Sequence, residues 1–129
     1  IRDHDRKTFE ARKAHFLKLA EDIDASFGGG CIKAEVKDSY YNMADVLLPH
    51  MHLIENAKIA MKSCGIEPMI RPIRGGTDGA RLSYMGLPCP NLSTGGLNFH
   101  GKREYIPVHS LEKMVEVLLK LVELYAMPQ

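Results

Sequence analysis

The chain has few cysteines and almost no excess of charge, and each shortage excludes a class of protein. Its 129 residues include three cysteines, Cys31, Cys64 and Cys89, and carry a formal net charge of +1. An odd number of cysteines without CxxC spacing argues against a disulfide framework or a zinc knuckle, and indicates reduced thiols in a core. The balanced charge provides no field that would attract nucleic acid or a membrane surface.

Long apolar runs are missing as well. No run approaches the roughly 18 residues that a membrane-spanning helix needs, and no signal peptide is visible. We therefore expect a soluble, cytoplasmic protein that binds neither nucleic acid nor membranes. With 45% hydrophobic residues, the chain is long enough for one modest core or two small ones that share a seam.

The first 46 residues predict a strand–helix–strand unit with one solvent-exposed side. From Asp5 to about Asp24, apolar residues lie near one stripe and charged residues on the other side, which indicates an amphipathic helix. The three glycines at residues 28–30 end it. Beyond them Ile32, Ala34 and Val36 alternate with charged residues, the pattern of a strand with one wet face.

Residues 47–129 predict an α/β arrangement. Strand, helix and strand in that order favour a right-handed crossover between parallel strands. The expected elements are a helix from about His50 to Cys64 ended by Gly65, a strand near Met69–Ile73, a helix from Asp78 to Met85, a strand ending at Thr94, and a final helix capped by Ser110.

The final helix is predicted to be a main anchor of this part of the chain. Its spacing places a set of large apolar side chains on one face, and burial of each is worth roughly 1.5–3 kcal/mol. The set consists of Leu111, Met114, Val115, Leu118, Val122 and Tyr125.

The turn from Arg74 to Asp78 is a candidate anion site. Gly75 and Gly76 let the backbone approach a ligand, and Thr77 or Asp78 can cap the helix that follows. Free N–H groups and the Arg74 guanidinium would suit a carboxylate or a phosphate. The alternative is that Arg74 only satisfies nearby backbone carbonyls.

His100 is a candidate metal ligand or acid–base group. It lies in a loop with Gly95, Gly96 and Gly101, which leave its imidazole free to project from the end of a strand. The alternative is an imidazole that bonds to the backbone of its own loop. Glu104, the acid nearby in the sequence, is placed to orient the ring.

Three segments carry a resemblance to a known family. They read IRDHDRKTFEARKAHF, KDSYYNM and RPIRGGTDGARLSYMGLPCPNLSTGGLNFHGKREYIPVHSLEKMVEVLLKL. Together they closely resemble the C-terminal end of the peptidase T family, the tripeptide aminopeptidases of the dinuclear zinc peptidase superfamily. The likeness extends over essentially the whole chain.

The resemblance implies an architecture, a cofactor and roles for particular residues. Residues 1–46 would be the last part of an α+β lid domain through which the family forms homodimers, and residues 47–129 the last part of a parallel-sheet catalytic domain. Two zinc ions would serve each active site, with His100 as one ligand. Arg74 would hold the carboxylate of a tripeptide, Gly75, Gly76 and Thr77 would shape its pocket, and Arg2 would be a second contact. Tyr40, Tyr41 and Asn42 favour packing at the hinge over substrate contact.

The same comparison predicts that this chain is a C-terminal piece of a longer enzyme. The sequence starts at Ile1, and nothing in it resembles the family's HxD metal motif or its catalytic Glu pair. We therefore expect no catalytic residue here, weak zinc binding at most, and no hydrolysis by the isolated chain. The alternatives are a non-catalytic anion-binding module that uses Arg74–Asp78, and an element that only mediates oligomerisation.

Overall fold

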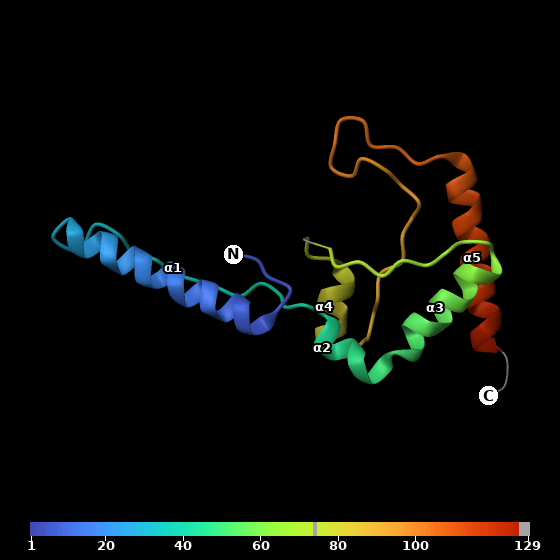
Figure 1. The fold of residues 1–129 in the computed structure, drawn as a ribbon, viewed down its shortest axis with the longest axis horizontal. Coiled ribbons are helices and arrows are strands. Elements are labelled where there is room, and N and C mark those ends of the chain that lie inside the picture. Colours follow the sequence, from blue (N-terminus) through green and yellow to red (C-terminus); the bar gives the residue numbers. More distant parts are fainter. Residues whose placement is uncertain (74, 127–129) are drawn as a thin grey trace.

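A computed structural model describes residues 1–73 and 75–126 as a set of helices joined by long connections (Figure 1). No strand forms in these two ranges, where the one ladder contact is an isolated antiparallel bridge between Leu97 and Tyr105. The helices are α1 (Arg6–Ser26), α2 (Ala44–Leu47), the 3-10 helix η1 (Leu48–His50), α3 (His52–Ser63), α4 (Asp78–Tyr84) and α5 (Val108–Ala126).

Helix α1 confirms the helix expected near the N-terminus. The Asp5 carboxylate caps it by accepting the Thr8 N–H at 2.7 Å. It also accepts the Thr8 hydroxyl at 2.7 Å, and the hydroxyl first, then the N–H, lower the pKa of Asp5. At the other end Gly28, Gly29 and Gly30 all have positive φ, as a chain that reverses direction requires. Residues 31–42 then run back alongside the helix, which projects away from the others (Figure 1). We call residues 3–42 the arm.

The tip of the arm is fixed by one carboxylate. Asp24 accepts backbone N–H groups from Gly30 at 2.9 Å and from Cys31 and Ile32 at 2.7 Å each. These bonds lower the pKa of Asp24 because they stabilise its ionised form. Asp24 therefore closes the turn after α1, a role that the sequence did not suggest.

The most extensive contact between helices joins α3 and α5. Ala60 of α3 and Val117 of α5 have no exposed surface, and Ala57 is also buried. Small side chains on α3 allow α5 to approach closely, so Val117 packs tightly. Gly65, with φ of 75°, ends α3 where the sequence predicted.

The strands predicted around residues 32–36, 69–73 and 90–94 are not confirmed. In the described ranges these segments have no ladder, so the structure does not confirm the parallel crossover or the α/β class. Alternating or continuous apolar residues in the sequence show which side chains could be buried. A strand also needs a neighbouring strand that pairs with its backbone N–H and C=O groups. Among the described residues, such backbone pairing occurs only at the Leu97–Tyr105 bridge.

Two details predicted for the last helix are wrong. Helix α5 begins at Val108, so Ser110 lies inside its first turn, where its N–H donates to the Pro107 carbonyl at 3.0 Å. The expected apolar face is largely exposed, with Leu111 at 53% and Val122 at 67%, whereas Val117 is buried. Apolar residues occupy two adjacent faces of α5, and α3 covers the one that contains Val117.

None of the described helices combines the length and the apolar composition that crossing a membrane would require. The division of the chain at residues 46 and 47 remains a prediction.

Candidate functional site

Thr77 starts α4 as one of the two predicted caps. Its Oγ1 accepts the Ala80 N–H at 3.2 Å and also accepts the side-chain amide of Asn91 at 2.9 Å. Thr77 thus joins the start of α4 to the segment that follows the helix. Arg74, the residue on which the predicted anion site most depends, lies outside the described residues.

An open groove of about 870 Å³ lies beside this turn. Its lining contains two of the predicted substrate-binding residues, Gly76 and Thr77. The other lining residues were not predicted to lie beside them. Its lining is Ser39, Tyr40, Gly76, Thr77, Asp78, Gly79, Arg81 and Asn91. Asn91 and Arg81 gave no sequence signal, and Tyr40 was expected to pack at a hinge.

The floor of the groove is closely packed. A Cβ on Gly79 would lie 2.6 Å from both the Asn91 side-chain oxygen and the Cys89 carbonyl, so only glycine allows α4 to approach this segment so closely. The buried Ser83 hydroxyl accepts the Cys89 N–H at 2.9 Å. These contacts hold one side of the groove in a single arrangement.

His100 lies in a short loop that begins at Leu97 and ends at Tyr105, residues whose backbones exchange hydrogen bonds of 2.9 and 3.2 Å. His100 has φ of 61° and Asn98 φ of 57°, both in the left-handed region that non-glycine residues seldom adopt. Such backbone strain concentrates at functional sites. The loop leaves His100 exposed.

Glu104 does not have the role expected for it. Its carboxylate accepts the backbone N–H of His100 at 3.2 Å. Glu104 therefore supports the strained backbone of the loop, and the expected contact with the imidazole ring is replaced by this one.

The described residues do not form a complete zinc site. They contain no group of three or more His, Cys, Asp or Glu side chains that could surround a metal ion. A zinc ion takes three or four protein ligands, and the role of His100 as one of them stays a prediction. His50 and His52 have ring centres 6.2 Å apart, and no third metal-binding side chain joins them in the described part of the chain.

Arg2 is not among the residues that line the groove. Its backbone carbonyl accepts a hydrogen bond from Arg12 at 3.2 Å, which ties the start of the chain to α1. The predicted substrate contact from Arg2 stays a prediction.

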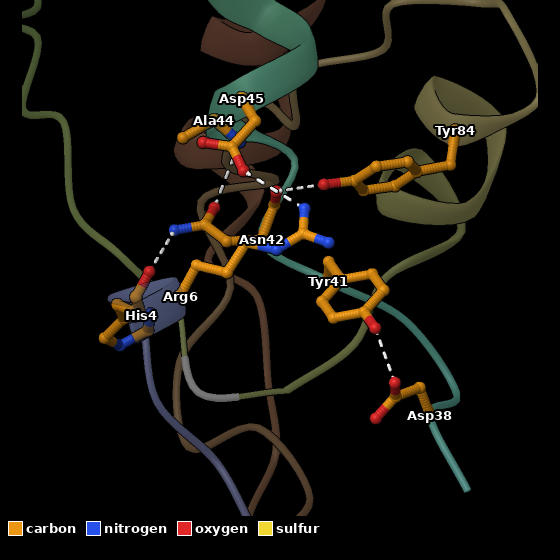
Figure 2. Close-up of polar contacts among 8 residues, drawn as sticks. All are labelled: His4, Arg6, Asp38, Tyr41, Asn42, Ala44, Asp45 and Tyr84. Atoms are coloured by element: carbon orange, nitrogen blue, oxygen red, sulfur yellow. Dashed lines mark hydrogen bonds and ion pairs between the residues drawn. The ribbon is translucent and has the colours of Figure 1, made fainter. Parts of the chain in front are cut away.

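A polar junction connects the arm to the rest of the chain (Figure 2). The Asn42 side chain donates to the His4 carbonyl and accepts the Ala44 N–H, both at 3.1 Å, while the Tyr84 hydroxyl donates to the Asn42 carbonyl at 2.8 Å. Burial raises the pKa of Tyr84. Asn42 thereby links the N-terminal segment, α2 and α4.

The arm reaches the junction through a second set of polar contacts. Tyr41 donates a short hydrogen bond to Asp38, which also pairs with Lys13 at 2.8 Å. Lys13 and Tyr41 together lower the pKa of Asp38, and Asp38 raises that of Lys13. Arg6 lies 4.4 Å above the Tyr41 ring. A hollow of about 180 Å³ at the junction includes Asp3, His4 and Asp45 in its lining.

No family model matches the chain. Known proteins do match it: a peptidase T of Caldanaerobacter subterraneus is 56% identical over 97% of the chain, one of Clostridium perfringens 53% over 98%, and one of Vibrio parahaemolyticus 54% over 98%. In each case the match covers 31% of the relative. The resemblance found in the sequence is thus confirmed: nearly the whole chain is homologous to a segment of peptidase T, and spans about a third of that enzyme's length.

Proposed function

We propose that the chain is the C-terminal portion of a zinc-dependent tripeptide aminopeptidase that releases the N-terminal residue from tripeptides. The observation that carries this proposal is the 56% identity to a peptidase T over 97% of the chain. The strained and exposed position of His100 supports it independently.

Within that enzyme the chain would supply binding groups and no catalytic residue. His100 would be one ligand to a pair of zinc ions, which when bound polarise the scissile carbonyl and lower the pKa of a water molecule. Arg74, Gly75, Gly76 and Thr77 would hold the peptide carboxylate, with Arg2 as a further contact. The isolated chain would be inactive because it offers a single metal ligand of this set.

Cytoplasmic location and a homodimer formed through residues 1–46 are part of the proposal. Exposed apolar side chains on α1 support the homodimer, since Phe16 and Leu19 are each 46% exposed and Ile23 is 47% exposed. Surfaces of this kind are typical of protein–protein contacts.

The test is a hybrid in which this chain replaces the matching segment of the Caldanaerobacter subterraneus relative. We expect the hybrid to release alanine from trialanine, and His100→Ala to lower that rate more than about 100-fold while reducing the bound zinc. His15→Ala, in α1, is the matched control and should leave both unchanged. A His100→Ala hybrid with full activity and full zinc content would refute the assignment.

An alternative is an anion-binding module that uses Arg74–Asp78 without catalysis. The cap at Thr77, at the start of α4, favours it. Inorganic phosphate that shifts the amide resonances of residues 75–78 in the isolated chain, combined with an inactive hybrid, would favour this reading over the peptidase.

A further inference from the structure

The groove beside α4 has two walls of different origin. One wall is built by α4 and residues 89–91, while Ser39 and Tyr40 come from the end of the arm, more than thirty residues earlier in the sequence. We infer that Tyr40 is a specificity-determining residue, whose ring sets the width of the groove and thereby selects peptides by the size of the side chain that lies there. This inference rests on the proposed peptidase function and adds a selectivity to it.

The Tyr40 ring lies directly against the backbone of Gly76. A Cβ placed on Gly76 would be 2.5 Å from both Cε1 and Cζ of Tyr40 and 2.9 Å from its hydroxyl oxygen. Contacts below about 3 Å are not tolerated between carbon atoms, so the ring occupies the space that any side chain at position 76 would need. Gly76 is thus the residue that admits the ring, a reason for its presence separate from approach to an anion.

The opposite wall is tied to α4. Asn91, itself exposed, donates its side-chain amide to Thr77 at 2.9 Å, and Gly79 leaves no free space between α4 and the Asn91 side chain. Tyr40 is 37% exposed, so part of its ring faces solvent. Tyr40 supplies the aromatic ring of the lining, so a smaller residue there would widen the groove.

The polar groups of the groove fit a short peptide better than a simple anion. Asp78 and Arg81 place both signs of charge in the lining, and Asn91 adds an amide. A peptide carries both charges and amide groups, whereas phosphate offers only negative charge. A side chain of a peptide bound in this groove would contact the Tyr40 ring.

The experiment is a titration of the 129-residue chain with trialanine and with Ala-Ala-Phe, followed by amide resonances. We expect both peptides to shift the resonances of residues 76–81 and 91, with trialanine bound at least 10-fold more tightly. Tyr40→Ala should reduce this ratio to below threefold, because the groove widens, and Tyr40→Phe should preserve it. Gly76→Ala should weaken both peptides at least fivefold, because its methyl group pushes the ring into the groove.

The outcomes separate the inference from the proposed function. Tyr125→Ala, on the exposed surface of α5, is the control and should leave the ratio unchanged. If both peptides bind in the groove and Tyr40→Ala leaves the ratio of their affinities unchanged, the role of Tyr40 in selectivity is overturned. The peptidase proposal then remains intact. Shifts confined to other residues would overturn the groove as the binding place. No binding of either peptide, together with an inactive hybrid, would remove both.

Discussion

The arm and the α3–α5 pair are held together by different kinds of interaction. None of the residues of α1, all of which the structure describes, is buried, whereas α3 and α5 bury Ala57, Ala60 and Val117. The arm depends on polar groups such as Asp5, which caps α1, and Asp24, which closes its far end. One region is thus stabilised by packing and the other by charge and hydrogen bonds.

The two kinds of interaction differ in strength. A fully buried apolar side chain contributes roughly 1.5–3 kcal/mol, whereas an ion pair on the surface contributes about 0–1 kcal/mol. The α3–α5 pair should therefore determine the free energy of unfolding, while the arm should open locally at a lower cost in free energy.

The largest expected effect comes from the packed pair. Val117→Ala should lower the free energy of unfolding by about 2 kcal/mol, because it leaves a cavity where no solvent reaches. Val115→Ala, the matched control on the exposed face of the same helix, should change it by less than about 0.5 kcal/mol. Urea denaturation measures both, and equal losses would contradict the assigned packing.

A smaller effect is expected at the start of α1. Asp5→Ala removes the cap and should cost about 1 kcal/mol of local stability, which hydrogen exchange of the α1 amides reports. Asp22→Ala, near the far end of the same helix, is the control, because it removes only an exposed pair with Lys18. The α3 amides should exchange as before in both variants; if they exchange faster, the two regions are coupled more tightly than the structure indicates.

Acid should affect the arm before the helical pair. The pKa values of Asp24 and Asp38 are lowered in the folded chain, so their contributions are fully present above the unfolded pKa near 4 and are lost as the pH falls through the folded values. The protection factors of the Gly30, Cys31 and Ile32 amides, which correct for the intrinsic exchange rate at each pH, should therefore fall on acidification. Asp24→Asn should make these protection factors insensitive to this titration, and an unaltered acid response would contradict the role of Asp24.

Salt should produce the smallest effect. At 1 M ionic strength the Debye length falls to about 3 Å, which weakens the pair between Lys13 and Asp38. We expect a slight acceleration of exchange at residues 38–41 and none in α3 or α5. Lys13→Met should show the same slight change without added salt, and a large effect in α3 would contradict this division of forces.

Sequence reasoning predicted the elements whose signals are local. The glycines after α1, Gly65 and the cap at Thr77 each act within a few residues, and α1, α3 and α4 formed close to their expected bounds. The strands failed because pairing depends on a partner far along the chain or outside it. The buried face of α5 was wrong for a related reason, since only the position of α3 decides which apolar face is covered.

The candidate site was predictable to a lesser extent. Thr77, Gly76 and His100 were singled out from turns and glycine spacing, and the structure gives the first two a shared groove. Tyr40 reaches that groove from the far side, a contact between positions separated by 36 residues that no local pattern encodes. The strain at His100 was equally invisible, because a φ angle follows from the whole loop.

The most direct test of the account is a zinc titration of the isolated chain by calorimetry, with His100→Ala measured in parallel. We propose that this chain contributes His100 as one ligand to a site completed by other residues. We expect no tight zinc binding by the isolated chain, because one imidazole fills a single position of the three or four that protein ligands occupy around zinc, and we expect His100→Ala to change little. Stoichiometric binding in the nanomolar range that is lost in His100→Ala would contradict it.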